Sequence, residues 1–493
     1  MASAVPTVAV DQPVRAYGPR KQAFFDAAER LAPEYGKWRE LNRYFHEEDA
    51  RYLRFLVRPG LRVLELGCAR GDLLAALDCA TGIGIDFSPA TITAAREAHP
   101  ALDWRVGDVE DPDVIESLAE QDFDVILLSD TIGSLDDIQA TFERLHPLCG
   151  PDTRIIVSYY SGAWEPIIRL AEALGLKMPT LAQNWLSTED IRAILDLAGF
   201  QEIKREWRML VPKRLLGLGP LINRTLAVLP LIRRFCVRNY LVLRSTRPRA
   251  SRAPAPSLSV IVPCRNERGN IESAVRRLPR MAPRQEIVFI EGHSKDGTLE
   301  ECRRVAAAYP QLDIKVAVQD GKGKGDAVRK GFDMASGDIL MILDADLTVP
   351  PEDLPKFYQV LASSKGEFVN GSRLVYPMEH DAMRFLNLVA NRGFAAIFSY
   401  LLNQRVTDTL CGTKALSRQH YRELTAARSY FGDFDPFGDF DLIFGATKLN
   451  LELVEVPIRY HARTYGETQI SRFRHGWLLL RMVVFAFWKL KAI

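Results

Sequence analysis

The sequence lacks several features that assign a protein to a class quickly. Its seven cysteines form no Cys-x-x-Cys pair and have no histidine partners at metal-site spacing, so neither a zinc site nor a disulfide framework is predicted. The 64 basic and 62 acidic residues leave a formal net charge of +2. Such a balance gives no electrostatic case for nucleic-acid binding, so we expect no nucleic-acid partner.

Long uncharged apolar runs are also missing. None reaches the ~20 residues that a membrane-spanning helix needs, and residues 1–19 lack the basic-then-apolar layout of a signal peptide. We therefore expect a cytoplasmic protein that associates peripherally with the inner face of the cell membrane. The 493 residues are 47% hydrophobic, which is typical of a globular protein with two or three domains.

Strand-like and helix-like segments alternate along most of the chain, which indicates βαβ units around parallel sheets. The pattern occurs twice, without an internal repeat. In the first half we predict strands at 62–66, 82–86, 103–106, 124–128 and 154–159, and two closing strands at 203–210 and 240–244. In the second half the predicted strands are 258–262, 286–290, 314–318, 339–343 and 367–371.

A basic, proline-rich segment at 247–257 predicts an extended linker between two domains, 21–246 and 258–470. Residues 1–20 are expected to be disordered. The first domain contains an apolar and basic insert at 213–234, and the chain closes with an aromatic and basic helix at 471–493. Both segments suit the headgroup region of a membrane, and burial under the sheet or against a partner chain is the alternative.

A turn of small residues joins a strand to a helix near residue 67. Gly67 and Gly71 allow the backbone to bend tightly and approach a ligand, although a packing turn is the ordinary explanation of such glycines. Asp86 ends the next predicted strand, where an acidic residue meets a ribose diol in dinucleotide-binding and related folds. Two further strand ends supply Asp108-Val109 and Ser129-Asp130.

Together these residues resemble the class I S-adenosylmethionine-dependent methyltransferases over residues 40–246. The resemblance implies S-adenosylmethionine as cofactor, with the Gly67 turn near its methionine part, Asp86 at the ribose hydroxyls and Asp108-Val109 around the adenine. Ala69 stands where a glycine is usual. The first half is therefore a methyltransferase or, alternatively, an inert module that docks the second half onto a glycan assembly complex. The cofactor-binding residues implied are Glu65, Gly67, Gly71, Asp86, Asp108 and Val109.

Asp344 and Asp346 follow the apolar run 339–343, which is typical of a buried parallel strand. Open α/β sheets bind ligands at the carboxyl ends of their strands. Period-two alternation would point both carboxylates to one side, so that they share one Mg²⁺ or Mn²⁺ and hold a diphosphate. A solvated turn is the ordinary explanation of an isolated Asp-x-Asp, and the neighbouring motifs favour the metal site instead.

Those neighbouring motifs are P-x-x-N-E at 263–267, E-G-H-S-x-D-G-T at 291–298 and a flexible basic G-K-G loop at 321–325. The loop precedes a helix whose amides suit an anionic diphosphate. The ordered series is more specific than any member, and it resembles the family-two inverting glycosyltransferases, within them the polyprenyl-phosphate sugar synthases, over residues 257–476. It implies an α/β fold of two doubly wound Rossmann-like domains, the second of the GT-A type.

The same resemblance implies a nucleotide-sugar donor, GDP-mannose or UDP-hexose, and a lipid-phosphate or glycan acceptor at the membrane surface. Glu291 stands where an aspartate is usual, so the base of the donor is left open. The donor-binding residues implied are Pro263, Asn266, Glu267, Glu291, Asp296, Gly323, Lys324 and Arg463, and the metal ligands are Asp344 and Asp346.

Charge determines the expected mechanism. The leaving nucleoside diphosphate gains negative charge, which the cation and Lys324 would stabilise. A lipid phosphate is already an anion and needs no strong base, whereas a hydroxyl acceptor needs a carboxylate to take its proton. Asp408 and Asp441 are the candidates for that base, and helix capping is their alternative role. Asp344, Asp346, Asp408 and Asp441 are thus the predicted catalytic residues.

Overall fold

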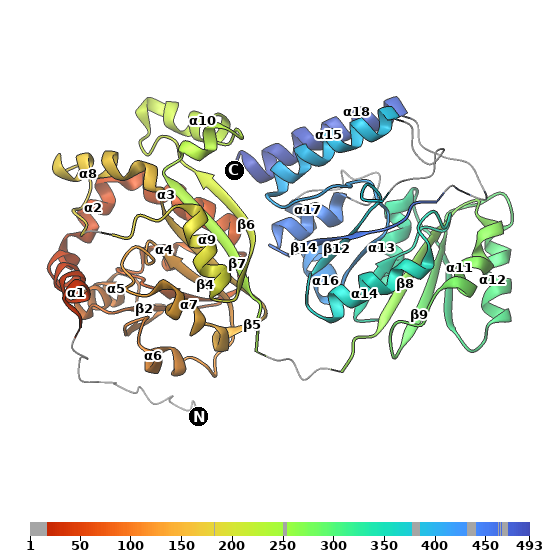
Figure 1. Cartoon of the computed structure of the whole chain (residues 1–493), viewed down its shortest axis with the longest axis horizontal. Helices are drawn as coiled ribbons and strands as arrows, with labels where there is room; N and C mark the ends of the chain where they lie inside the picture. Colours follow the sequence, from red (N-terminus) through yellow and green to blue (C-terminus); the bar gives the residue numbers. More distant parts are fainter. Residues whose placement is uncertain are drawn as a thin grey trace.

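The structure is a computed structural model of the whole chain. It describes residues 17–181, 183–249, 254–376, 385–430, 440–461, 463, 465 and 472–493. Within them, two seven-stranded sheets are flanked by helices (Figure 1). The strand orders are β3-β2-β1-β4-β5-β7-β6 and β10-β9-β8-β11-β13-β12-β14. The predicted α/β class with two doubly wound sheets is confirmed.

The first sheet is parallel from β3 to β5 and ends in two antiparallel strands, because β7 pairs antiparallel with both β5 and β6. The predicted strand positions agree with the observed ones. The strands are β1 (Arg62–Leu66), β2 (Thr81–Asp86), β3 (Asp103–Val106), β4 (Phe123–Ser129), β5 (Cys149–Tyr160), β6 (Phe200–Arg208) and β7 (Arg238–Ser245).

Helices of this half cover both faces of the sheet and its carboxyl edge. α1 begins at Pro19, inside the segment expected to be disordered, because proline suits the first turn of a helix. Residues 1–16 lie outside the described part. The helices are α1 (Pro19–Leu31), α2 (Tyr35–Leu41), α3 (Arg43–Leu56), α4 (Asp72–Ala76), α5 (Pro89–Ala98), α6 (Pro112–Glu116), α7 (Ile138–Glu143), α8 (Glu165–Ala173), α9 (Thr188–Leu197) and α10 (Leu218–Thr225).

The second sheet is mixed, because β13 runs antiparallel between β11 and β12. Sequence analysis predicted neither β13 nor β14 as a strand. Every residue of the apolar strand β11 is buried, as predicted. The strands are β8 (Leu258–Cys264), β9 (Gln285–Glu291), β10 (Asp313–Val318), β11 (Ile339–Ile342), β12 (Phe368–Ser372), β13 (Lys414–Ser417) and β14 (Leu453–Pro457).

β11 ends at Ile342, so Asp344 and Asp346 lie in the turn after the strand rather than on it. Strand alternation therefore does not set their directions, and that part of the sequence argument was wrong.

The helices of this half are α11 (Ile271–Arg277), α12 (Thr298–Ala308), α13 (Lys324–Met334), α14 (Leu354–Ala362), α15 (Phe385–Leu402), α16 (Arg418–Ala426), α17 (Phe440–Lys448) and α18 (Arg472–Ala486), which continues as a π-helical turn, Phe487–Lys491.

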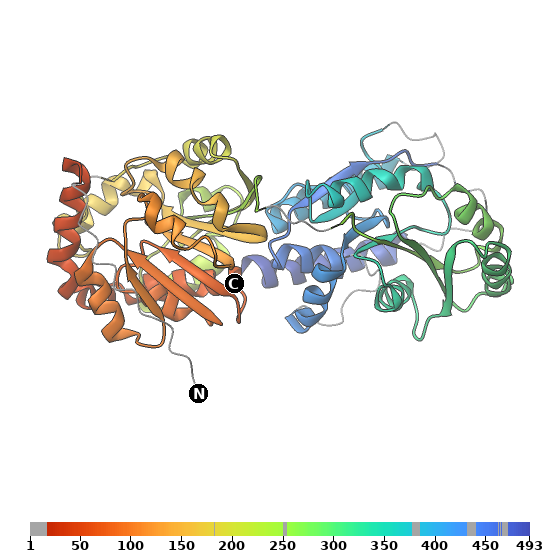
Figure 2. The same ribbon diagram turned by 90° about the horizontal axis from the view of Figure 1, so that it is seen from below.

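The two halves touch along an extended interface as well as through the linker. Figure 1 and Figure 2 both place the end of the chain against the first half. There Arg208 of β6 donates a hydrogen bond of 2.6 Å to the Lys491 carbonyl. Arg154 of β5 forms a buried bidentate ion pair with Glu367, with both distances 2.7 Å. One cluster of buried apolar residues includes side chains from both halves.

Candidate active sites

The predicted donor-binding residues lie along the carboxyl edge of the second sheet. β8 pairs in parallel with both β9 and β11, so the loops after these three strands emerge at the same edge. Pro263 is the penultimate residue of β8, Glu291 ends β9, and Asp344 follows β11. The sequence prediction that these groups share one edge is confirmed by this pairing, whereas their roles are not tested by it.

Asp344 is paired with the lysine of the predicted phosphate loop. Lys324 Nζ lies 2.6 Å from Asp344 Oδ1, at the first residue of α13 and directly after Gly323, whose φ is +89°. A Cβ atom on Gly412 would lie 2.1 Å from both Asp344 Oδ2 and Lys324 Nζ, so a side chain there would displace the pair. Burial opposes ionisation of Asp344, but Lys324 outweighs it and lowers the pKa of the carboxyl.

Asp346 is held by the arginine that the sequence assigned to phosphate. Arg463 Nη2 lies 2.5 Å from Asp346 Oδ2. Asp346 Oδ1 accepts hydrogen bonds from the Thr348 amide at 3.2 Å and from its hydroxyl at 2.8 Å. Arg463 also lies 3.6 Å from Glu267 Oε1. Each aspartate of the Asp-x-Asp motif therefore faces a cation of its own.

The loops after β8 and β9 hold each other through the predicted nucleoside-side residues. The Asn266 amide donates to Ser294 Oγ at 2.8 Å, and Asn266 Oδ1 accepts from the Lys295 amide at 2.9 Å. Glu291 Oε1 accepts from the Ser294 amide at 2.5 Å. These side chains are used, at least in part, to fix the shape of the loops.

Two acidic residues close this end of the site. Burial raises the pKa of Glu267 to about 7, although Asn270 donates to it at 2.8 Å. Asp296 accepts from the Thr298 amide at 3.1 Å and from the Arg268 amide at 3.2 Å, at the start of α12. Asp296 thus organises a helix start, whereas Glu267 can change charge near neutral pH.

The two candidate bases have cationic partners. Asp408 is fully buried, and Arg373 donates to its two oxygens at 2.6 and 2.8 Å. Asp441, in the first turn of α17, lies 3.1 Å from Arg428 Nε. The partners of Asp408 favour a positioning role for it over proton transfer. The role of Asp441 as a base stays a prediction.

A cavity of about 540 Å³ opens at the carboxyl edge of the first sheet, a size that suits a small-molecule site. Of the six residues implied to bind cofactor, Gly71 alone does not line it. Gly71 instead packs under Trp104, since a Cβ atom there would lie 2.1 Å from the indole. Gly71 therefore shapes the turn, and the other five residues face the cavity.

The glycine turn keeps its left-handed backbone despite the departure at Ala69. The φ angles are +77° at Gly67, +45° at Ala69 and +74° at Gly71. The Ala69 amide donates to Asp86 Oδ2 at 2.9 Å, which ties the turn to the end of β2. A Cβ atom on Gly67 would lie 2.5 Å from the Thr131 hydroxyl. Gly67 thus leaves room for the Thr131 side chain, and Ala69 does not disrupt the turn.

The carboxylates that line this cavity differ in their hydrogen bonds, their ion pairs and their pKa values. Asp86 is 7% exposed and also accepts from the Ser88 amide and the Thr91 hydroxyl, both at 3.0 Å. Burial raises the pKa of Glu65 to about 8, so it is largely protonated at neutral pH. Asp108 forms an ion pair with Lys21 of α1, and Lys21 also lies 2.7 Å from Glu110.

Sequence analysis missed the cover of this cavity. Arg20 of α1 donates to the carbonyls of Gly133 at 3.1 Å and Leu135 at 3.0 Å, in the loop after β4. Residues of α1 and α2 line the cavity from the side opposite the sheet. Nothing in the spacing of the residues predicts this contact, because the partners are more than a hundred positions apart.

A group of three potential metal ligands lies at the interface of the two halves, within the described residues: Asp152, Glu367 and His420. Glu367 is already bound on both oxygens by Arg154, and His420 Nε2 lies 3.1 Å from Asp152. Arg154, Glu367, Asp152 and His420 thus form two polar contacts at the interdomain interface.

Four helices that carry exposed apolar side chains lie along one edge of the molecule. α8 and α10 of the first half and α15 and α18 of the second all lie along the top edge of Figure 1. α18 buries Leu479, Met482 and Ala486 and exposes its opposite side. Among the described helices, none combines the length and apolar character needed to cross a bilayer. We define the apolar face as Leu215, Leu216, Leu218, Leu221, Leu231, Phe235, Trp477, Leu480, Val484 and Trp488, all exposed.

Two family models match the chain. Residues 34–204 match one described as Methyltransferase domain, and residues 259–425 match one described as Glycosyl transferase family 2. These matches confirm the two resemblances found in the sequence.

Curated relatives match part of the chain. The low-salt glycan biosynthesis hexosyltransferase Agl6 of Haloferax volcanii is 28% identical over 47% of this chain and 54% of its own length. The dolichol-phosphate mannosyltransferase of Pyrococcus furiosus is 28% identical over 43% of this chain and 59% of its own length. That of Saccharomyces cerevisiae is 38% identical over 21% of this chain and 40% of its own length. The chain thus spans about half the length of the curated relatives it matches.

Solved structures align with each half separately. A SAM-dependent methyltransferase of Thermotoga maritima, described as a possible histamine N-methyltransferase, has 19% identity and a TM-score of 0.35, covering 45% of this chain and 99% of its own. Glucosyl-3-phosphoglycerate synthase of Mycobacterium tuberculosis, in complex with phosphoglyceric acid, has 20% identity and a TM-score of 0.36, covering 48% and 80%.

Proposed function

Because the chain joins a methyltransferase domain to a glycosyl transferase family 2 domain, we propose that it transfers a hexosyl group, with inversion, from a nucleoside-diphosphate sugar to a polyprenyl phosphate. The observation that carries the proposal is the pair of aspartate–cation contacts, Asp344 with Lys324 and Asp346 with Arg463, at the carboxyl edge of the sheet. Relatives named as dolichol-phosphate mannosyltransferases support the acceptor class.

The donor set fits a divalent cation. Two carboxylates separated by one residue offer the oxygen ligands that Mg²⁺ and Mn²⁺ prefer, so Asp344 and Asp346 would hold the ion. The ion would supply positive charge to the leaving diphosphate. Lys324 and Arg463 face the aspartates, and their side chains are 30% and 27% exposed. When the donor binds, both side chains would turn toward the diphosphate oxygens. The rearrangement replaces two protein ion pairs by contacts to the donor.

The acceptor side requires little proton transfer if the acceptor is a phosphate. Asp408 would then orient Arg373, whose guanidinium could face an anionic acceptor while its carboxylate partner fixes it. Asp441 would remain the base for a hydroxyl acceptor. Glu267, with a pKa of about 7, contacts Arg463, which would in turn contact the donor.

The apolar face supports the proposal that this site works at a membrane surface. Large apolar side chains from both halves lie along one edge of the molecule together with the exposed cations Arg214, Arg224 and Arg234. An anionic bilayer fits both features, since tryptophan and arginine side chains suit the headgroup region and basic residues attract acidic lipids. We assign the inner face of the cell membrane because the proposed donors are cytoplasmic metabolites.

The first half would bind S-adenosylmethionine in the cavity beside Gly67 and Asp86. If the first half were instead an inert docking module, it would not need an intact cofactor-binding site. The intact turn and the cavity it faces favour the methyltransferase.

Calorimetry tests the proposal directly. The full chain is titrated with GDP-mannose and with UDP-hexoses, each with Mn²⁺ and with EDTA, and separately with S-adenosylmethionine. We expect one nucleotide sugar to bind with Mn²⁺ and to lose most of its affinity in EDTA. Failure of every nucleotide sugar to bind would contradict the transferase, and failure of S-adenosylmethionine alone would leave the first half as a docking module.

A further inference from the structure

We infer that the methyl acceptor of the first half is a sugar hydroxyl of a glycolipid, and that Asp130 takes the proton of that hydroxyl. The inference rests on the proposed binding of S-adenosylmethionine. Three observations carry it: the chemical division of the cavity, the geometry of Asp130, and the apolar rim at the mouth of the cavity.

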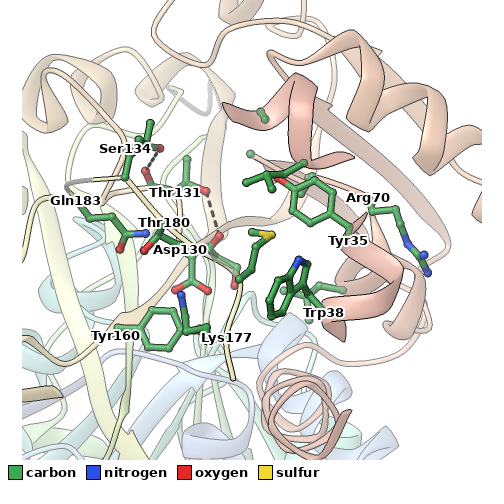
Figure 3. A pocket seen from close by; sticks show the side chains of 18 of the residues that line it. Tyr35, Trp38, Arg70, Asp130, Thr131, Ser134, Tyr160, Lys177, Thr180 and Gln183 are labelled. Carbon is green, nitrogen blue, oxygen red and sulfur yellow. Dashed lines mark hydrogen bonds between the residues drawn. The ribbon is translucent and has the colours of Figure 1, made fainter. Parts of the chain in front are cut away.

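Two chemically different groups of residues line the cavity. One group is the glycine turn with the carboxylates of Glu65, Asp86 and Asp108. The other group consists of aromatic and apolar side chains: Trp38, Phe45, Tyr160, Trp164, Ile168 and Met178. In Figure 3, Asp130, Tyr160 and Lys177 lie together, with Trp38 across from them.

Asp130 is a charged residue of the cavity lining that lies beside Tyr160 and Lys177 (Figure 3). It follows β4, the side chain is 39% exposed, and its φ of +59° is a conformation that non-glycine residues adopt mainly at turns and functional sites. Oδ1 accepts a hydrogen bond from Arg238. Within the described part of the chain, no hydrogen-bond donor reaches Oδ2. One oxygen is thus held and the other is available to a ligand.

Arg238 holds Asp130 through one nitrogen, Nη1, while its other nitrogens bind neighbouring residues. It is completely buried, and it donates to Asp49 with two contacts of 3.1 Å and to Ser158 at 3.0 Å. Its guanidinium also lies 5.0 Å from the Tyr160 ring centre. The network fixes the carboxylate in one orientation, which is what general-base catalysis requires.

The surroundings of Asp130 favour a neutral acceptor over a cationic amine. Arg238 and Lys177 place positive charge on two sides of the carboxylate. Flat aromatic faces with a few polar groups suit a sugar ring.

The mouth of the cavity is apolar and leads toward the apolar face. Ile167, Leu176 and Leu181 line the cavity and are also exposed, at 52%, 48% and 36%. Leu170 and Leu174 extend this apolar surface along and just beyond α8, on the same edge of the molecule as α10. An alkyl or polyprenyl chain can therefore remain in the bilayer while its headgroup reaches Asp130.

The transfer step balances as follows. S-adenosylmethionine supplies a methyl group on a sulfonium: the acceptor oxygen bonds to the methyl carbon as the carbon–sulfur bond breaks and its electron pair stays on sulfur. The hydroxyl proton passes to Asp130 Oδ2. The bound Arg238 keeps Asp130 in place throughout.

The test uses decyl β-D-glycosides of glucose, mannose and galactose, below their micelle concentrations, with labelled S-adenosylmethionine and the full chain. We expect label in at least one decyl glycoside, little in the matching methyl glycoside, and a loss of roughly 10²-fold or more in Asp130→Asn. Asp103→Asn, an exposed carboxylate at the start of β3, is the matched control and should behave as wild type.

Two measurements separate catalysis from folding. Calorimetry should give Asp130→Asn the wild-type affinity for S-adenosylmethionine. Trp38→Ala, which leaves Arg238 untouched, should weaken the change in tryptophan emission caused by the decyl glycoside but not cofactor binding. Equal methylation of methyl and decyl glycosides, preference for decylamine, or more than a tenth of wild-type rate in Asp130→Asn would overturn the inference. No nucleotide sugar is present, so failure of the transferase would not affect the result.

Discussion

Asp346 gives the sharpest prediction at the scale of single residues. Its carboxylate is held by Arg463 and Thr348 at the end of the sheet, so Asp346→Ala removes one anionic ligand of the proposed cation. Losing one electrostatic stabiliser of a leaving group costs ~10² to 10³ in rate. We expect that loss in sugar transfer measured by label in extracted lipid, with an unchanged melting temperature.

Asp313→Ala provides the control for this change. Asp313 is exposed at the amino end of β10, away from the carboxyl edge, and its loss should leave transfer at the wild-type rate. Turnover of more than about a tenth of wild type in Asp346→Ala would show that this carboxylate is not a metal ligand.

Glu452 predicts a pH dependence of stability. Burial raises its pKa to about 7 from an ordinary value of 4.5, and its Oε2 has no hydrogen-bond partner among the described residues. Between these two values the folded protein binds more protons than the unfolded chain, so stability falls as pH rises from about 4.5 to about 7. Glu452→Gln should therefore melt higher than wild type at pH 8 and nearly the same at pH 4.5.

The exposed Glu40→Gln serves as the comparison and should change neither melting temperature. A wild-type difference between pH 4.5 and pH 8 that Glu452→Gln leaves intact would assign the slope to another group.

At the scale of elements, one side of α18 is buried in the protein and the other side is exposed. Leu490 and Lys491 at its end are buried against the first half, so deleting the helix would also remove an interface. Substituting only its exposed side is the cleaner change. We expect Trp477→Ser combined with Trp488→Ser to reduce co-sedimentation with anionic liposomes at unchanged melting temperature, because both indoles face outward.

Leu312→Ser, which removes an exposed leucine beside β10, is the matched control. If the double variant sediments with liposomes as wild type does, or if wild type never does, α18 is not a membrane contact.

The elements also show what sequence could predict. Apolar runs and glycine turns predicted most strands. A strand buried on both faces is apolar along its length, and a turn with positive φ angles favours glycine, so both features are visible in the local sequence. β13 is four residues long and begins with Lys414, so it has no apolar run that would predict a strand. The ion pairs of Asp346 and Asp108 and the contacts of Arg20 join residues far apart in the chain. Only the folded arrangement brings such partners together, and the Asp130–Arg238 pair was missed for the same reason.

At the scale of the whole molecule, the two halves contact each other directly as well as through the linker. Arg154, Arg208 and Lys491 bind across the interface, and an apolar core is shared. Both proposed sites and the apolar face therefore have fixed positions relative to one another. A glycolipid made by the second half would lie at the same membrane surface from which the first half would take its acceptor.

One measurement tests the central claim most directly: mass spectrometry of lipid extracted after the purified chain has acted on a polyprenyl phosphate with Mn²⁺ and a panel of nucleotide sugars, with and without S-adenosylmethionine. The account predicts that with one donor the lipid gains a single hexose, and that this hexosyl lipid gains a methyl group when the cofactor is present. A lipid whose mass stays unchanged with every donor would contradict it.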